Sequence, residues 1–294
     1  MIKKKSKITL LDIAVLLILC GLIAYIIYQI TVKLNYKWQW GVIPQYLFRR
    51  DAESGKWVPN YLMQGLFTTL RLSIWAGILA TIFGTLMGLM RTSKGLFYRM
   101  IARSYVELMR NLPPLIIIFI FYFFLSDQIM PIIGLDDFLR SASVETQRIF
   151  EILFAPPSMA SAFVSAFFTL AIFEGAYITE IVRAGIESVE KGQWEAAHAL
   201  ALSQWHTMRY VILPQAIQRL LPALAGQFIS LIKDSAIVSI ISIQDLSYQG
   251  TQLMASTYLT IEIWITVALM YLVLTLSCSL AVGKLETYMA RSRA

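Results

Sequence analysis

The chain has 294 residues, of which 57% are hydrophobic and only 15% are charged, and its formal net charge is +7. Soluble domains carry about 25% charged residues, so the composition excludes an ordinary soluble domain and indicates a membrane protein with several spans. The surplus basic residues lie in short segments beside apolar runs, as orientation signals do, and nucleic-acid binding is therefore not expected.

The sequence gives no sign of an enzyme or a metalloprotein. Cys20 and Cys278 lie in separate apolar runs, and His198 and His206 are not spaced as metal ligands. The sequence also lacks a phosphate loop of the form GxxxxGK[ST], so any ATP that drives this chain has to be hydrolysed by a partner. We therefore predict no catalytic residue, no metal and no cofactor within the chain itself.

The N-terminal region, residues 1–60, is predicted to contain one transmembrane helix and an extracytoplasmic connector. A lysine-rich start precedes an apolar run over residues 8–32, which is too long for the apolar part of a signal peptide. The basic flank places the N-terminus in the cytoplasm. The connector, residues 33–60, combines several tryptophans with basic residues that are unusual for the outer side of a membrane.

The second and third spans are predicted over residues 61–90 and 104–125. Ala80, Gly84 and Gly88 recur at four-residue spacing in the second span and form a small-residue stripe that permits close helix packing. A basic loop then returns to the cytoplasm. Two consecutive prolines, at positions 113 and 114, are expected to break or restart the third helix, and Glu107 is expected to pair with Arg110.

The remaining spans are predicted over residues 158–182, 220–243 and 259–282. The loop over residues 126–157 has an excess of acidic residues, as expected on the outer side, and residues 244–258 are also placed outside. Residues 183–219 and the basic C-terminus are placed in the cytoplasm. The fold class is thus an all-α polytopic membrane protein with about six transmembrane helices and both termini in the cytoplasm. Its core is residues 61–294.

The cytoplasmic loop over residues 183–219 contains an ordered segment, GQWEAAHALALSQWHTMRYVILP, which runs from position 192 to position 214. Five of its side chains, most of them small or apolar, fall within an arc of roughly 140° on a helix, namely Ala196, Ala197, Leu200, Ala201 and Gln204. Glu195 is expected in the first turn, where a carboxylate interacts well with the positive helix end. By spacing alone, the segment is either an amphipathic connector on the membrane surface or a docking helix.

The same segment resembles the cytoplasmic EAA loop of ABC-importer permeases, in which EAA is followed by three residues, Gly, nine residues and I-x-L-P. Glu195, Ala196 and Ala197 match the first part of the pattern, and Leu213 and Pro214 match its end. Ala201 stands where the family has Gly. Since Ala loses the conformational freedom of Gly and favours helix, we expect the following turn to be more helical than usual.

Further motifs extend the resemblance from residue 61 to the C-terminus. The segments YVELMRNLPPL, GAYITEIVRAG and LIKDSAIVS resemble the polar amino-acid branch of these permeases, with glutamate/aspartate-type permeases the most similar. The resemblance implies a type I importer-like permease fold in a bacterial inner membrane. It also implies a second permease chain, identical or paralogous, two ABC ATPase subunits that hold ATP and Mg, and an extracytoplasmic amino-acid-binding protein.

Two groups of residues are assigned on this basis. The residues expected to couple the permease to the ATPase are Gly192, Glu195, Ala196, Ala197, Leu200, Ala201, Leu213 and Pro214. Glu195 is expected to pair with a basic residue of the ATPase, and simple capping of the helix N-terminus is the alternative. The expected substrate path consists of intramembrane charges and nearby hydroxyls, namely Arg71, Glu174, Lys233, Asp234, Ser235 and Ser239.

Adjacent positions on a helix point about 100° apart, so Lys233 and Asp234 are expected to face different surroundings. The alternative is that the intramembrane charges form ion pairs that lock the helices together. The function expected from these observations is ATP-driven import of polar amino acids, with acidic amino acids or their amides favoured. One alternative is an ion-coupled secondary amino-acid transporter that uses Glu174, Lys233 and Asp234, and another is a membrane receptor or assembly protein that does not transport.

Overall fold

The computed structural model describes residues 10–29 and 36–291. The chain divides into two compact units, Met1–Trp40 and Gly41–Ala294. The division predicted from sequence, after residue 60, differs from this boundary. The reason is that residues 41–60 fold as a short helix and a hairpin, which belong to the second unit and contact its long helices.

The first unit contains helix α1 (Leu10–Tyr28). It has 19 residues, about the length that crosses the hydrocarbon core of a bilayer. Its apolar side chains are exposed, with Leu16, Leu17 and Ile18 among them. The predicted first span, residues 8–32, extends at both ends beyond the described residues.

The second unit begins with a small extracytoplasmic cap. It consists of helix α2 (Ile43–Leu47) and an antiparallel hairpin of strands β1 (Phe48–Arg50) and β2 (Trp57–Pro59), in which Arg49 pairs with Val58. Asp51 stabilises the turn by accepting hydrogen bonds from the backbone and hydroxyl of Ser54. The pKa of the Asp51 carboxyl is lowered by these hydrogen bonds.

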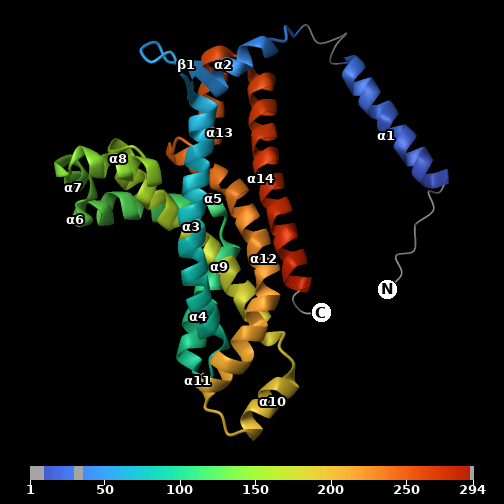
Figure 1. The fold of residues 1–294 in the computed structure, drawn as a ribbon, viewed down its shortest axis with the longest axis vertical. Helices are drawn as coiled ribbons and strands as arrows, with labels where there is room; N and C mark the ends of the chain where they lie inside the picture. The colour runs from blue at the N-terminus through green and yellow to red at the C-terminus, as the bar shows by residue number, and fades with distance from the viewer. Residues whose placement is uncertain (1–9, 30–35, 292–294) are drawn as a thin grey trace. The chain divides into compact units, whose positions relative to one another are not determined.

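Within the described residues, five helical segments are long and apolar enough to cross a membrane, namely Tyr61–Thr92, Pro114–Ile133, Pro157–Glu187, Gln204–Ile241 and Thr260–Lys284. The corresponding helices include α3 (Tyr61–Thr92), α5 (Pro114–Phe124), α9 (Ala160–Glu187), α12 (Leu213–Asp234) and α14 (Thr260–Arg291). With α1, they form the all-α polytopic fold that the sequence predicts. The predicted cytoplasmic loop over residues 183–219 lies at one end of the second unit and the hairpin lies at the other (Figure 1).

The predicted third span, residues 104–125, is wrong at its start. Residues 96–111 form a separate amphipathic helix, α4 (Leu96–Asn111), and the membrane-spanning segment begins only at Pro114. The reason is the proline pair, which cannot continue a helix but is suited to start one. The predicted pair of Glu107 and Arg110 is also wrong, because Glu107 pairs with Arg103 and the guanidinium of Arg110 lies 5.6 Å from the ring centre of Tyr177.

Helices α3 and α9 pack along one another and form the main axis of the second unit. The predicted small-residue stripe lies in this interface, since Ala80, Gly84 and Gly88 are all buried. A Cβ atom at Gly84 would lie 2.7 Å from Ile178, and one at Gly88 would lie 2.6 Å from Val182. Glycine is therefore required for this approach, and the prediction of close packing is confirmed.

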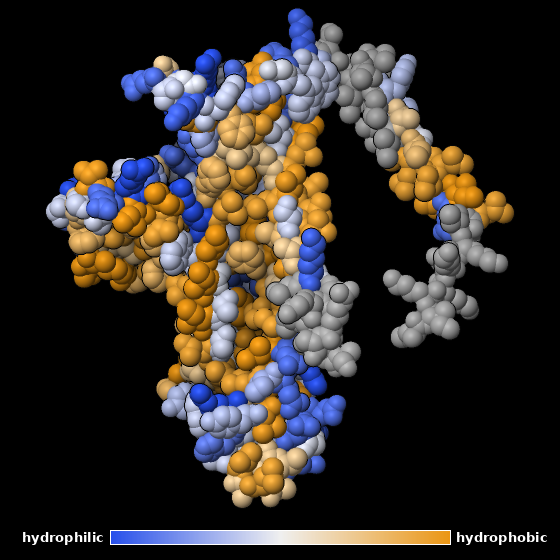
Figure 2. Space-filling model, in the orientation of Figure 1, coloured by the Kyte–Doolittle hydropathy of each residue, from blue (hydrophilic) through white to orange (hydrophobic). Residues whose placement is uncertain are grey.

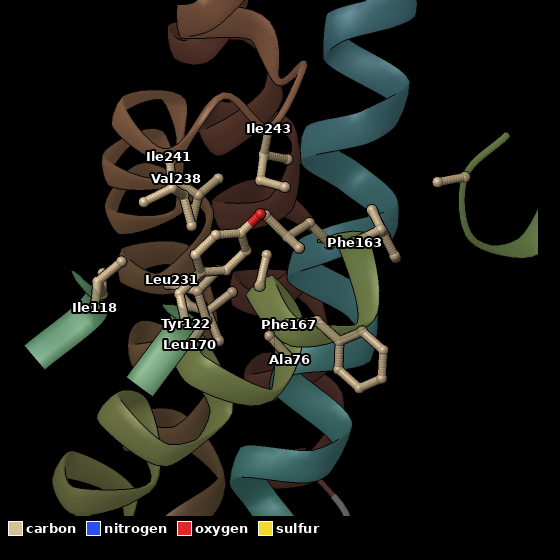
Figure 3. Packing of buried hydrophobic residues seen from close by; sticks show 13 residues of the cluster. Ala76, Ile118, Tyr122, Phe163, Phe167, Leu170, Leu231, Val238, Ile241 and Ile243 are labelled. Atoms are coloured by element: carbon tan, nitrogen blue, oxygen red, sulfur yellow. The ribbon is translucent and has the colours of Figure 1, made fainter. Parts of the chain in front are cut away.

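A hydrophobic cluster joins the outer halves of α3, α5, α9 and α12 (Figure 3). Leu72 and Leu170 are fully buried there, and the ring of Tyr122 from α5 lies between α9 and the chain that follows α12. Trp75 extends the cluster by donating a hydrogen bond from its indole nitrogen to the carbonyl of Leu153 at 2.9 Å. The cluster holds the four spans together around a common core.

A lateral arm begins within the third candidate span, Pro114–Ile133, directly after α5. It contains the π-helical segment η3 (Leu125–Ile129) and three short helices, α6 (Met130–Ile133), α7 (Leu135–Ser141) and α8 (Val144–Leu153). Ile132 and Val144 are each 82% exposed. Figure 2 shows apolar surface gathered on the lower side of this arm and over the middle of the bundle, with hydrophilic residues at the two ends.

The fifth span has two features that place functional residues. Pro222 lies inside α12, where it removes one backbone hydrogen bond. After Asp234 the helix tightens into the 3-10 segment η6 (Ser235–Ile241), which leads to α13 (Leu246–Thr257) on the outer side. Asp245 caps α13 by accepting hydrogen bonds from the backbone amides of Ser247 and Tyr248, and burial raises the pKa of its carboxyl to about 6.

Candidate functional site

The predicted coupling segment forms helix α10 (Lys191–Ala199), followed by α11 (Gln204–His206) and the π-helical segment η5 (Thr207–Ile212). Ala197 is 2% exposed, and Trp194 packs against the cluster formed by α9 and α12. Glu195 and Ala196 are exposed on the opposite side. Leu200, at the helix end, is 74% exposed. The residues predicted to form one face therefore differ in exposure. Ala197 is buried and fixes the helix, whereas Ala196 and Leu200 remain accessible.

Glu195 does not lie in the first turn of α10. The helix begins at Lys191, with Glu190 at the N-cap position, and its first turn contains no acidic residue. The interpretation of Glu195 as a capping or dipole residue is therefore wrong. Its carboxylate stands in the middle of an exposed helix face, beyond the region where the helix end acts on it.

The helix ends in a Schellman motif, in which the amide of Leu202 bonds to the carbonyl of Ala197 at 3.1 Å and the amide of Ala201 bonds to that of His198 at 2.9 Å. Ala201 has a φ of 54°, the left-handed conformation that the motif requires. The expectation that this turn is more helical is wrong. Ala201 adopts the backbone conformation that glycine adopts more easily, because the motif satisfies the last carbonyl groups of α10.

Two contacts fix the coupling segment to the membrane core. The side-chain amide of Gln215 donates a hydrogen bond to the Oε1 atom of Gln193 at 3.1 Å, and the Arg219 guanidinium donates one to the carbonyl of Ser188. Leu213 is the first residue of α12 and Pro214 lies in its first turn, so α11, η5 and α12 form one continuous rod.

A cavity of about 450 Å³ lies beside α12, between α5 and α9. Its lining is mixed, with apolar walls and polar groups that converge on one volume, namely Pro114, Phe173, Tyr177, Gln227, Ser230, Lys233, Asp234 and Ile237. Lys233 and Asp234 both line it, so the expectation that they face different surroundings is wrong. Both side chains are exposed and lie at the C-terminal end of α12, directly before the 3-10 segment.

Glu174 stands directly behind this cavity. It is 0% exposed, and its Oε2 atom accepts a hydrogen bond from the side-chain amide of Gln227 at 2.7 Å. Its other oxygen, Oε1, is buried and has no hydrogen-bond partner in the described structure. A buried carboxylate with one unsatisfied oxygen is costly, and such groups are most often retained for function.

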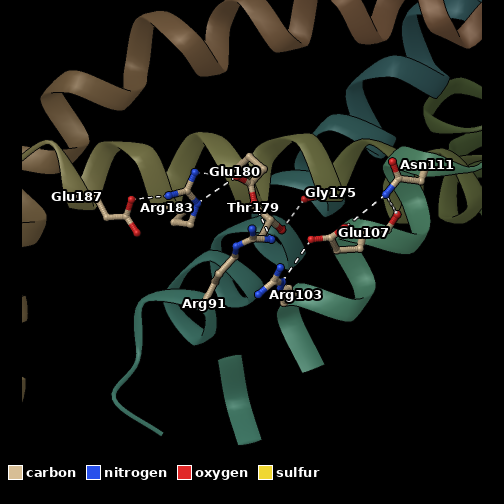
Figure 4. Close-up of polar contacts among 9 residues, drawn as sticks. All are labelled: Arg91, Arg103, Glu107, Asn111, Gly175, Thr179, Glu180, Arg183 and Glu187. Atoms are coloured by element: carbon tan, nitrogen blue, oxygen red, sulfur yellow. Dashed lines mark hydrogen bonds and ion pairs between the residues drawn. The ribbon is translucent and has the colours of Figure 1, made fainter. Parts of the chain in front are cut away.

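The alternative of a helix-locking ion-pair set does not apply to these residues. Among the described residues, the ion pairs of the membrane helices connect Arg91 and Arg183 with Glu180 and Glu187 at the cytoplasmic end (Figure 4). Glu174, Lys233 and Asp234 take no part in an ion pair there. Charges near the cavity are thus left available to a ligand, while charges at the cytoplasmic end satisfy one another.

Three predicted substrate-path residues lie elsewhere. Arg71 lines a separate outer cavity of about 330 Å³, together with Glu151 and several glutamines. Ser235 is buried and donates its hydroxyl hydrogen to the carbonyl of Ile232 at 2.8 Å, and Ser239 lines neither cavity. Sequence reasoning instead missed Tyr177, Gln227 and Ser230. Ser230 lies one helical turn and Gln227 two helical turns before Asp234, a spacing that the sequence shows.

The fold defines a polytopic membrane protein with a short, exposed helix, α10, between α9 and α12. The chain belongs to the family described as "Binding-protein-dependent transport system inner membrane component", whose model matches residues 62–291. It is therefore a multi-span inner-membrane component of a transport system, and residues 1–61 lie outside the matched region. Within the described residues, no group of three or more metal-ligating side chains occurs.

Curated relatives cover the same part of the chain. The probable glutamine ABC transporter permease protein GlnM of Bacillus subtilis (strain 168) is 33% identical over 230 residues, which are 78% of this chain and 94% of that protein. The glutamine transport system permease protein GlnP of Escherichia coli (strain K12) is 34% identical, over 78% of this chain and 92% of that protein. The glutamate/aspartate import permease protein GltK of Escherichia coli O157:H7 is 29% identical, over 77% and 92%.

Solved structures share the fold. The crystal structure of an amino acid ABC transporter with histidines superposes with a TM-score of 0.61 at 32% identity, and covers 78% of this chain and 94% of that one. The MetNI methionine ABC transporter in an inward-facing conformation gives a TM-score of 0.59 at 19% identity, over 78% and 96%, which shows the common fold alone.

Proposed function

We propose that this chain is the permease subunit of an ATP-driven importer of polar amino acids. The observation that carries the proposal is the cavity beside α12, which presents the ammonium of Lys233, the carboxylate of Asp234 and the amide of Gln227 to one volume. An amino acid offers a carboxylate, an ammonium and a polar side chain, so each group finds a partner of opposite character. The volume of about 450 Å³ is within the usual range for small-molecule sites.

The charge balance of this cavity favours an amide over an acidic side chain. Lys233 and Asp234 can pair with the substrate's carboxylate and ammonium, after which the lining holds no second cation. Glu174 stands behind Gln227 and adds a further carboxylate nearby. An anionic side chain would meet this carboxylate, whereas an amide can bond to Gln227 or Ser230. Glutamine, which GlnM and GlnP are named for, is the expected substrate.

Coupling to ATP hydrolysis is assigned to α10. Family membership implies ABC ATPase subunits and a binding protein, and the proposed assembly has two permease chains, identical or paralogous, and two ATPase subunits that hold ATP and Mg. The exposed face with Glu195, Ala196 and Leu200 offers a charge, a small side chain and an apolar anchor for the ATPase. Gly192 is open to solvent beside them, since a Cβ there would meet no atom within 4 Å.

The substrate assignment is tested by uptake into proteoliposomes that contain the permease, its ATPase and its binding protein. Asp234→Asn and Lys233→Gln are each expected to raise the KM for glutamine roughly tenfold or more, the equivalent of losing one charge-assisted interaction. Arg140→Gln on the outer arm, where Arg140 is 81% exposed, is the control. Unchanged kinetics in both cavity variants would remove the cavity from the substrate path.

The coupling assignment is tested with Glu195→Lys in the same system. We expect ATP hydrolysis that no longer responds to substrate-loaded binding protein, with uptake lost and the permease still inserted. Glu145→Lys, an equal charge reversal at an exposed position of α8, is expected to have no effect. Normal uptake by Glu195→Lys would show that this residue does not contribute to docking.

The ion-coupled alternative makes a different prediction from the same residues. If Glu174, Lys233 and Asp234 carried a proton or sodium ion, an ionophore would abolish uptake and an ATPase-inactive partner would not. We expect the reverse result, and family membership supports that expectation. A receptor or assembly protein that does not transport is excluded by any ATP-dependent uptake in the proteoliposomes.

A further inference from the structure

A second charged cavity lies at the cytoplasmic end of the second unit. It has a volume of about 420 Å³ and lies where the end of α3, the start of α4 and the end of α9 meet. Four arginines and one glutamate supply its polar lining, namely Arg91, Arg99, Arg103, Arg183 and Glu187, with Leu96 and Met100 beside them. The cavity is therefore strongly cationic.

Part of this charge is already neutralised. Arg91 forms a 2.8 Å ion pair with Glu180, and Arg183 bonds to both Glu180 and Glu187 (Figure 4). These groups are partly buried, with side chains of Arg91 and Glu180 only 19% and 17% exposed. These ion pairs connect α3 to α9 and hold the guanidinium groups in place.

The other two arginines are free to bind a ligand. No carboxylate among the described residues lies within ion-pair distance of Arg99. Arg103 pairs with Glu107 at 3.3 Å, but their side chains are 73% and 53% exposed, and such exposed pairs contribute little. Arg99 and Arg103 are four residues apart and lie on one face of α4. The site therefore presents two available guanidinium groups beside a fixed pair.

Helix α4 also places this site at the membrane surface. Phe97, Ile101 and Leu108 fall on one face of the helix and are 70%, 39% and 53% exposed. The arginine face lies roughly opposite, and α3 delivers α4 directly from its cytoplasmic end. An amphipathic helix with one apolar and one basic face is the form that lies in a membrane interface. Phosphate groups are concentrated at that depth.

We infer that the cavity lined by Arg91, Arg99, Arg103 and Arg183 binds a phosphate oxyanion on the cytoplasmic side. Guanidinium groups bind phosphate oxygens in bidentate fashion, and basic pockets between membrane helices on this side bind anionic headgroups. The phosphate can come from an anionic phospholipid or from free phosphate. The site is separate from the proposed substrate cavity, and the inference does not depend on which substrate is carried.

The test is binding of dioleoyl phosphatidylglycerol to the full-length permease, purified with the ATPase that accompanies it and measured by native mass spectrometry. The double variant Arg99→Gln/Arg103→Gln is expected to bind this lipid about 30-fold more weakly, since each basic residue contributes about fivefold at a membrane surface. Binding of phosphatidylcholine should be equal in both proteins. The control is Arg140→Gln/Arg148→Gln on the lateral arm, which removes the same charge from exposed positions.

A competition with inorganic phosphate distinguishes the two sources. If millimolar phosphate displaces the lipid and stabilises the wild type but not the double variant, free phosphate is a ligand of the site. If phosphate has no effect while the lipid preference depends on Arg99 and Arg103, the ligand is the headgroup. Equal binding of the anionic lipid by wild type and double variant, or an equal loss in the control, overturns the inference. Since Arg99 is exposed and unpaired, Arg99→Gln alone provides a folded variant with the smaller, fivefold expectation.

Discussion

The charged side chains of the membrane helices are of two kinds, those that form ion pairs and those that do not. At the cytoplasmic end, Arg91, Glu180 and Arg183 satisfy one another between α3 and α9. Beside the cavity of α12, Glu174 and Asp234 have no ion pair among the described residues, and one oxygen of Glu174 has no hydrogen bond at all. Paired charges stabilise a helix interface, whereas unpaired charges are costly unless a ligand uses them. The comparison separates paired from unpaired charge within one helix, α9.

The largest effect is expected from Gly84→Leu, which tests the fixed side of this comparison. A Cβ at position 84 already meets Ile178 at 2.7 Å and the carbonyl of Gly175 at 2.8 Å, so a leucine forces α3 away from α9. We expect a loss of at least about 3 kcal/mol, seen as failed insertion or a strongly lowered Tm in detergent. Gly226→Leu is the control, because a Cβ at Gly226 meets no atom within 4 Å; equal damage in both variants would contradict the close-packing argument.

A smaller effect is expected when the ion pair itself is broken. Arg91→Gln leaves Glu180 half-satisfied in a partly buried place, and we expect a loss of about 1–3 kcal/mol. The double variant Arg91→Gln/Glu180→Gln should lose less than the sum of the two single variants, as a double-mutant cycle on thermal unfolding can measure. Arg140→Gln removes an exposed ion pair with Asp137 and should change stability by less than about 0.5 kcal/mol. Additive single effects would show that the pair does not act as a lock.

Glu174→Gln tests the other side of the comparison. Glutamine keeps an oxygen that can accept from Gln227 and removes a buried charge, so the free energy of unfolding should stay constant or rise by up to about 1 kcal/mol. Uptake should nevertheless fall about tenfold, because the electrostatic surroundings of the substrate change. A clear loss of stability with normal uptake would place Glu174 among the structural charges.

The smallest effect is expected from Ala201→Gly in the coupling segment. Ala201 has a φ of 54°, which an L-residue adopts at a cost of about 1–2 kcal/mol, and glycine loses part of this gain through its larger entropy in the unfolded chain. We therefore expect Ala201→Gly to raise the free energy of unfolding by about 0.5 kcal/mol. This is measured as a slightly higher Tm, with unchanged ATPase coupling. A lower Tm would indicate that this turn is helical after all.

Much of the fold could be predicted from residue patterns. Apolar length gives the spans, basic flanks give the orientation, and the four-residue stripe of Ala80, Gly84 and Gly88 gives the α3–α9 contact. The start of the third span could not be placed in the same way. Tyr105 and its neighbours are apolar enough to resemble membrane residues, so the proline pair predicts a break in the helix but not that α4 lies outside the span. Its Tyr105 hydroxyl donates to the carbonyl of Ile172 at 2.5 Å.

The residue types of the candidate site could be predicted from the sequence, but the positions of these residues in the structure could be predicted only in part. Intramembrane charge indicated Lys233, Asp234 and Glu174, which the structure places in or beside one cavity. Their role in a substrate path stays a prediction. Intramembrane charge also selected Arg71, which lines another cavity, because a charge in a span does not reveal which side of the helix bundle it faces. The roles of Gln227 and Tyr177 depend on the approach of α9 to α12, and neutral polar residues carry no signal strong enough to be recognised without it.

Pro222 divides α12 into two segments. Before it, Ala216 and Leu220 are packed in the cluster that also contains α10, and after it, Gln227 and Lys233 form the wall of the cavity. A proline removes one rung of the hydrogen-bond ladder and makes that point the easiest place for a helix to bend. The segment that packs with α10 and the segment that lines the cavity are therefore joined at the point of α12 where the helix bends most easily.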